Sequence, residues 1–175
     1  SGKTVVALYA CLLAIAHGRQ AAIMAPTEVL AQQHFGNIER YLAGSRVRRL
    51  LLRGGLGRSE RAAGLGAIAA GDVDLVVGTH ALVQEDVAFR DLALVVVDEQ
   101  HKFGVVQRAN IRTKGPLPHY LVMTATPIPR TLAMTVFGDL DVSVIDGSPP
   151  GRGRVETKIV SGSDWDRLMA ELRPR

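Results

Sequence analysis

Two short groups of residues in this 175-residue chain carry side chains suited to phosphate chemistry. The first is Gly2-Lys3-Thr4, which stands directly before an apolar segment of helical character. Glycine lets a backbone approach phosphate, and a helix start presents free amide groups to its charge. Lysine can reach the β- and γ-phosphates of a nucleotide, and a threonine hydroxyl can bind Mg²⁺. These residues match the second half of the pattern G-x-x-x-x-G-K-[ST], although so short a match also occurs by chance.

The second group is Asp98-Glu99, which ends an apolar run over residues 92–97. Parallel sheets bind their ligands at the carboxyl ends of strands. There Asp98 could hold Mg²⁺ opposite Thr4, and Glu99 could orient and deprotonate an attacking water. An isolated acidic pair at a strand end is usually a solvated turn, so the interpretation depends on both groups together. Asp98, Glu99 and His101 could instead form a zinc cluster, but their spacing fits neither a catalytic nor a structural zinc site.

The elements that must position these groups follow from the hydrophobic pattern. Short apolar runs alternate with longer mixed segments, which predicts an α/β fold with a mostly parallel sheet and helices on both faces. Strands are predicted at 20–25, 46–52, 74–78, 92–97, 120–123 and 142–145. Helices are predicted at 5–16, 27–42, 59–70, 105–114 and 129–137, with Thr27 and Ser59 as N-caps and Gly71 as a stop signal.

Composition and domain organisation narrow the class of protein. Hydrophobic residues make up 47% and charged residues 22%, as expected for a folded domain. The net charge of +4 does not by itself indicate nucleic-acid binding. The longest apolar run, 5–16, is too short to span a bilayer, and a single cysteine favours a reducing cytoplasm.

The Gly/Pro-rich stretch 147–154 predicts a linker, so we expect one domain at 1–146, truncated within its phosphate loop, and the start of a second at 147–175.

Five ordered motifs carry a resemblance to a known family. Residues 98–101 are DEQH, followed by FGV at 103–105 and QR at 107–108. The others are APTEVLA at 25–31, GTHAL at 78–82, MTATPIPRT at 123–131 and GDLD at 138–141. Together they resemble the RecG family of ATP-dependent DNA helicases, in superfamily 2, over almost the whole chain. The transcription-repair coupling factor shares TATPIPRT, but the DEQH, THAL and GDLD segments favour RecG.

The resemblance implies a RecA-like motor domain that uses ATP and Mg²⁺. The residues that match the phosphate-binding loop are Ser1, Gly2, Lys3 and Thr4. Asp98 and Thr4 match the metal-binding pair, Glu99 matches the residue that activates water, and Gln100 and His101 match sensors of the γ-phosphate. Thr124 and Thr126 match the motif that couples hydrolysis to DNA movement. Without the resemblance, these two threonines could simply hydrogen-bond their own turn.

The resemblance also implies contacts to a DNA strand. The residues that match them are Pro26, Thr27, Glu28, Gly54, Thr79 and His80. Arg53 precedes Gly54 where the family more often has a small hydroxyl residue, which weakens the match there. Ordinary helix capping by Thr27 and Thr79 is the competing interpretation, and the two roles are compatible.

The function implied by the resemblance is that of a motor acting on branched DNA, through fork reversal and junction migration. In the family, a second motor domain and a separate wedge domain of the same chain complete the machine. We therefore expect the 175 residues alone to have negligible ATPase activity. Two other classes remain open: a DNA- or partner-binding module without turnover, and an unrelated P-loop NTPase or kinase.

Overall fold

A computed structural model of the chain describes residues 2–98, 118–125 and 141–145, and the single residues 159, 161, 165 and 169. The chain divides into two compact units, Ser1–Ile145 and Asp146–Arg175. The predicted helices at 105–114 and 129–137 lie outside the described residues. That the second unit begins another motor domain stays a prediction.

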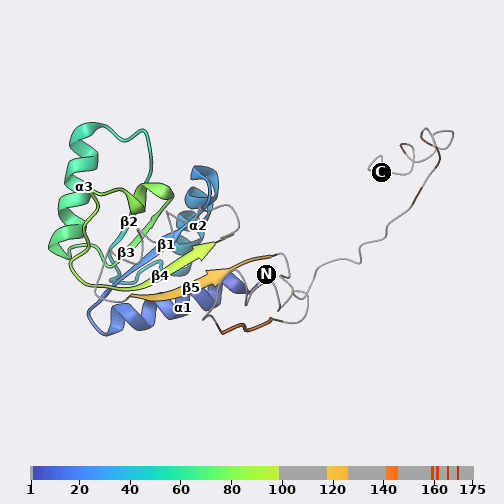
Figure 1. The fold of residues 1–175 in the computed structure, drawn as a ribbon, viewed down its shortest axis with the longest axis horizontal. Coiled ribbons are helices and arrows are strands. Elements are labelled where there is room, and N and C mark those ends of the chain that lie inside the picture. The colour runs from blue at the N-terminus through green and yellow to red at the C-terminus, as the bar shows by residue number, and fades with distance from the viewer. Residues whose placement is uncertain are drawn as a thin grey trace. The chain divides into compact units, whose positions relative to one another are not determined.

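A parallel sheet forms the centre of the first unit (Figure 1). Its strands are β1 (Gln20–Met24), β2 (Arg49–Leu52), β3 (Leu75–Gly78), β4 (Leu92–Asp98) and β5 (His119–Met123). They lie in the order β2-β3-β1-β4-β5, and every neighbouring pair is parallel. The predicted α/β fold is therefore confirmed, and all five strands end at the same edge of the sheet.

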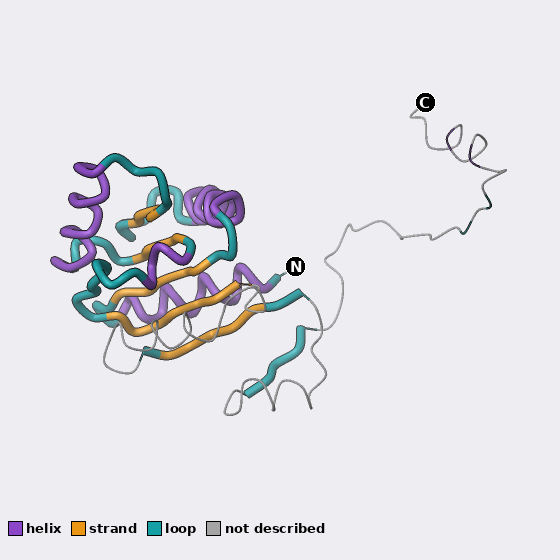
Figure 2. The backbone as a smooth tube through the Cα atoms, turned by 45° about the horizontal axis from the view of Figure 1, so that its top comes forward, coloured by secondary structure: helices purple, strands orange, loops and turns teal. Residues whose placement is uncertain are grey.

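Helices cover both faces of this sheet (Figure 2). The helices α1 (Lys3–Ala16) and α2 (Glu28–Tyr41) pack on one face. The helix α3 (Arg58–Ala70) and the short 3-10 helix η1 (His80–Val83) pack on the other. Among the described helices, none combines the length and apolar character needed to cross a membrane.

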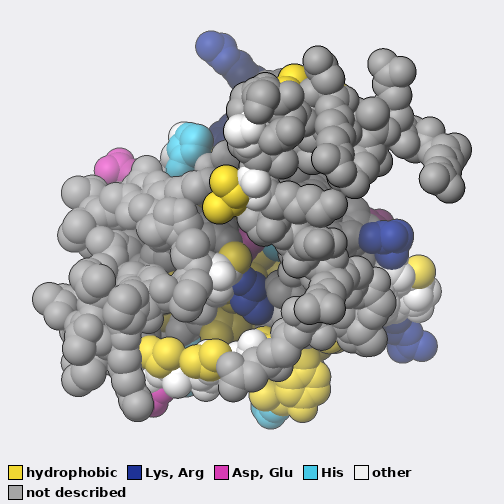
Figure 3. All heavy atoms as spheres, turned by 90° about the vertical axis from the view of Figure 1, so that its right-hand side faces the viewer, with side chains coloured by type: hydrophobic (Ala, Val, Ile, Leu, Met, Phe, Trp, Pro, Cys, Tyr) yellow, Lys and Arg dark blue, Asp and Glu magenta, His cyan; other side chains and the backbone are white. Residues whose placement is uncertain are grey.

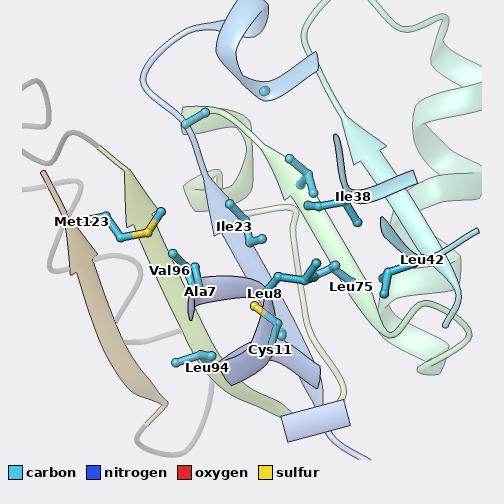
Figure 4. Packing of buried hydrophobic residues seen from close by; sticks show 14 residues of the cluster. Ala7, Leu8, Cys11, Ile23, Ile38, Leu42, Leu75, Leu94, Val96 and Met123 are labelled. Carbon is cyan, nitrogen blue, oxygen red and sulfur yellow. The ribbon is translucent and has the colours of Figure 1, made fainter. Parts of the chain in front are cut away.

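Residue alternation along the strands divides the core in two. In β1, Ala21 and Ile23 face α1 and α2, whereas Ala22 and Met24 face α3 and η1. Figure 4 shows the first of these clusters, in which Cys11 of α1 lies among residues of four strands and α2. Both faces are apolar because both are covered, which is why these strands are continuous apolar runs in the sequence.

Polar contacts stabilise the edge of the sheet where the strands begin, opposite the edge where they end. Buried Gln20 donates to the carbonyls of Ile68 and Val73 and accepts from the amides of Arg90 and Asp91. Hydrogen bonds from Arg19 lower the pKa of the Asp91 carboxyl. Every hydrogen-bonding atom of the Gln20 amide is thereby used, as a buried amide requires.

Several element ends agree with the prediction. Thr27 caps α2 as expected, with its hydroxyl accepting from the Leu30 amide at 3.3 Å. Gly71 ends α3 in the left-handed conformation, at a φ of 77°. Glycine is favoured there because it has no Cβ to clash.

One predicted helix cap, one strand boundary and one predicted strand are wrong. Ser59 does not cap α3, because the Arg61 amide already bonds to the Gly57 carbonyl and places Ser59 within the first turn. The strand β2 begins at Arg49 rather than residue 46, since the Arg48 amide donates to the Asp74 carboxylate instead of a neighbouring strand. Residues 141–145 form no strand; they are exposed, and no described strand pairs with them.

Candidate nucleotide and nucleic-acid site

The register of the sheet aligns the ends of all five strands. Leu52, Gly78, Met24, Val97 and Val122 are successive partners in one row across the sheet. Neighbouring parallel strands lie about 4.8 Å apart, so the residues just after this row occupy a single edge. That edge receives the segments that follow the strands, and most of the predicted site residues belong to those segments.

The start of α1 lies at the same end of the sheet as the arrowheads of β4 and β5 (Figure 1). The helix packs on β1 and β4, and both Lys3 and Thr4 in its first turn are partly exposed. No described side chain caps this helix start, and its first turn holds no acidic residue. The amide groups and the positive end of the helix dipole therefore favour an anion at this position.

Asp98 ends β4 beside this helix and is bound by a histidine of α2. The His34 Nε2 atom lies 2.8 Å from Asp98 Oδ2, and the two side chains are only 12% and 15% exposed. Within the described part of the chain, Asp98 Oδ1 makes no hydrogen bond. One carboxylate oxygen is thus oriented by His34, and the other remains able to bind a cation.

The segments after β1 and β2 meet at the other side of the edge. Glu28 begins α2, and Gly54 follows β2. A Cβ built on Gly54 would lie 2.6 Å from Glu28 Oε1, so the Glu28 carboxylate lies directly against the Gly54 backbone. The structure therefore brings together two of the segments predicted to contact DNA.

Thr79 and His80, which follow β3, have opposite exposures. Thr79 is 1% exposed, whereas His80 is exposed at the start of η1. The Thr79 hydroxyl does not cap η1 and has no hydrogen-bond partner in the described part of the chain. Helix capping is thus wrong as an explanation for Thr79. Of these two predicted contacts, His80 is the one that a DNA strand can reach without rearrangement.

Thr124 follows β5 beside the end of β4. Met123 pairs with Asp98 in the sheet, and Thr124 is the next residue along the chain. The side chain of Thr124 is partly exposed. The edge consequently runs from Gly54 through Thr79 and Pro26 to Asp98 and Thr124.

Figure 3 looks at the molecule from the right of Figure 1, the side toward which the strands point. Basic and apolar side chains of described residues are both visible on this face. The predicted residues Ser1, Glu99, Gln100, His101 and Thr126 lie outside the described residues. Among all the residues that the structure describes, no group of three or more His, Cys, Asp or Glu side chains is placed to hold a metal ion.

Comparison with known proteins assigns the chain to a family. The profile of the DEAD/DEAH box helicases matches residues 1–135, most of the chain. The chain belongs to the DEAD/DEAH box helicase family.

The relatives found for this chain include RecG helicases, the family that its motifs resemble. It is 54% identical to the ATP-dependent DNA helicase RecG of Haemophilus influenzae, over 92% of the chain and 24% of the relative. It is 55% identical to RecG of Escherichia coli strain K12, over 90% of the chain and 23% of the relative. The chain thus spans about a quarter of the length of the curated relatives it matches.

A solved structure extends the similarity to three dimensions. The structure of RecG bound to a three-way DNA junction matches the chain with a TM-score of 0.84 and 42% identity. The match covers 98% of this chain and 23% of that one. The predicted resemblance to RecG helicases is therefore confirmed.

Sequence reasoning missed one residue of the site in this helicase chain. His34 lies between Ala31 and Ile38, two buried positions that define the sheet-facing side of α2. A histidine on an otherwise apolar stripe was the available signal. Its partner could not be inferred, because Asp98 is 64 residues away in the sequence.

Proposed function

We propose that this chain is an ATP-hydrolysing motor domain of a helicase that acts on branched DNA. The observation that carries the proposal is the common edge of the sheet. At one side of this edge are the free start of α1 and the Asp98 carboxylate; at the other are Glu28, Gly54 and His80. Such an edge can bind a nucleotide and a DNA strand simultaneously on one rigid sheet.

ATP phosphates would bind at the start of α1. Lys3 supplies the positive charge, and the free amides of the first turn supply hydrogen-bond donors. Glu99, directly after β4, would orient and deprotonate the attacking water. Gln100 and His101 would detect the γ-phosphate, and Thr124 and Thr126 would couple hydrolysis to DNA movement.

The residues present fit a Mg²⁺ ion. Asp98 has one carboxylate oxygen without a hydrogen bond among the described residues, and Thr4 offers a partly exposed hydroxyl. Hard oxygen ligands of this type are those that Mg²⁺ prefers. When bound, the ion would neutralise the charge on the β- and γ-phosphate oxygens.

Branched DNA is the substrate class that the relatives support. The similar solved structure is that of RecG bound to a three-way DNA junction. By analogy, the protein that contains this chain would reverse forks and migrate junctions. A further motor domain and a wedge domain of that protein would complete the machine.

The test uses the purified protein that contains this chain, with a three-way DNA junction as substrate. We expect ATP-dependent unwinding and phosphate release that rises when the junction is added. Glu99→Gln should abolish hydrolysis while preserving the binding of a fluorescent ATP analogue. Loss of analogue binding in Glu99→Gln would contradict the assigned base role.

The same assay separates the competing classes. Junction binding without any phosphate release would instead support a binding module without turnover. Translocation on duplex DNA with no unwinding of the junction would favour a motor resembling the transcription-repair coupling factor. We also infer a cytoplasmic location, because these 175 residues hold one cysteine and so no disulfide between two of them.

A further inference from the structure

One contact at the sheet edge connects the two halves of the candidate site. The His34 Nε2 atom of α2 lies 2.8 Å from Asp98 Oδ2 at the end of β4. An ionised carboxylate can only accept a hydrogen bond, so the imidazole N–H donates. Both side chains are largely buried, at 12% and 15% exposed, which limits competition from water. The bond therefore orients the carboxylate more firmly than a surface pair would.

The first turn of α2 belongs to the segment predicted to contact DNA. Thr27 caps the helix, and Glu28 in its first turn lies against Gly54. His34 follows Glu28 by six residues, less than two helical turns. The helix is continuous from Glu28 to Tyr41 and holds no proline that would kink it, so Glu28 and His34 belong to one unbroken helix.

In the packing of α2, His34 provides a contact with β4, the strand that carries Asp98. Ala31 and Ile38 on the same helix are buried and pack against the face of the sheet. The helix lies mainly over β2 and β3 rather than β4. Among the bonds of the described residues, only that of His34 joins an α2 side chain to a side chain of β4.

We propose that His34 is a positioning residue that orients Asp98 for the metal ion and transmits movement of α2 to it when DNA binds. This inference rests on the proposed ATPase function and deepens it. DNA held at the start of α2 shifts the helix, and His34 carries that shift to the Asp98 carboxylate. Loss of a hydrogen-bond partner that orients a metal ligand typically costs about 10- to 100-fold in metal affinity or activity.

The test compares three variants in the protein that contains this chain. His34→Ala removes the donor, and His34→Gln restores an N–H at the same number of bonds from the backbone. Gln33→Ala, at an exposed neighbouring position of the same helix, is the matched control. If His34→Ala does not fold, His34→Leu fills the space without a donor and replaces it.

The readouts are binding of a fluorescent ATP analogue with Mg²⁺ and with EDTA, binding of a three-way junction, and phosphate release with and without that junction. For His34→Ala we expect the Mg²⁺ concentration for half-maximal analogue binding to rise by about 10- to 100-fold. Binding in EDTA and the affinity for the junction should be unchanged, and junction stimulation of hydrolysis should fall. His34→Gln should recover most of the loss, and Gln33→Ala should behave as the wild type.

Two results would overturn the inference. One is a Mg²⁺ dependence and junction stimulation that are unchanged in His34→Ala. The other is an equal loss of analogue binding with Mg²⁺ and with EDTA, which would indicate a structural role only. Failure of the proposed function can be told apart from failure of this inference. It would appear as a wild-type protein that does not hydrolyse ATP, while the Mg²⁺ dependence of analogue binding would still test the role of His34.

Discussion

At the scale of single residues, neighbouring glycines at this sheet edge have different physical roles. A Cβ on Gly54 would meet the flexible end of Glu28, whereas a Cβ on Gly57 would meet nothing within 4 Å. The first position constrains a candidate DNA contact, and the second is an ordinary helix start at a φ of −58°. This difference allows a matched pair of substitutions.

Gly54→Ala should weaken DNA binding while leaving the fold intact. The added methyl group displaces the Glu28 carboxylate, which can rotate away at little cost to stability. We expect the junction affinity to fall by about fivefold, equivalent to about 1 kcal/mol, in a fluorescence anisotropy titration. Gly57→Ala should bind as the wild type does. Equal affinity of both variants would remove Glu28 and Gly54 from the DNA interface.

Burial of Cys11 should make the free energy of unfolding of the domain decline at alkaline pH. Burial raises the pKa of its thiol from 9.0 to about 12. Between these values the folded state keeps the proton that the unfolded state loses, so the stability contribution is complete below pH 9 and declines above it. From pH 8 to pH 10, the wild type should lose about 1 kcal/mol more of its free energy of unfolding than Cys11→Ala does.

Urea titrations of both proteins at the two pH values measure this difference. The native thiol should also resist iodoacetamide at pH 8, since the thiolate is the reactive form. Rapid alkylation under native conditions would show that Cys11 is not buried as described.

At the scale of elements, the close approach of β2 and β3 depends on Gly78. A Cβ there would lie 2.5 Å from the Leu52 carbonyl oxygen, a backbone atom that cannot rotate away. Gly78→Ala should therefore destabilise the domain by about 1–3 kcal/mol, as measured by the midpoint of urea unfolding.

Gly66→Ala is the control for this prediction. Gly66 lies within α3, and a Cβ there meets nothing within 4 Å. Alanine has the higher helix propensity, so the variant should gain about 0.5–1 kcal/mol. A Gly78→Ala protein as stable as the wild type would contradict the described register of β2 and β3.

Most elements in the described region could be predicted from local pattern. Continuous apolar runs marked the five strands, and Thr27 and Gly71 marked helix ends, because these signals depend on near neighbours in the chain. The error at Ser59 was local, because α3 begins just after Gly57, whereas the other errors involve residues far away in the sequence. Asp74 takes the Arg48 amide and shortens β2, and the mostly apolar residues 142–145 lack a described partner strand.

At the scale of the whole molecule, the 175 residues alone are expected to hydrolyse ATP very slowly. The resemblance to RecG helicases implies a second motor domain whose arginines would stabilise charge on the transferred phosphoryl group. Loss of such a residue typically costs about 10³- to 10⁵-fold in rate. A phosphate-release assay comparing the 175 residues with the longer protein, each with the three-way junction, measures this ratio. Comparable rates would show that this domain is catalytically self-sufficient.

The sequence by itself determined the α/β class, the order of the motifs and the chemistry that each motif could perform. Those properties depend on residue type and short-range spacing, which are visible in the chain. Only the tertiary structure decided which motifs meet. Strand order and register align segments far apart in the sequence, bring Glu28 against Gly54, bury Thr79 and join His34 to Asp98. These contacts depend on how crossover helices place each strand, and local residue patterns do not specify that placement.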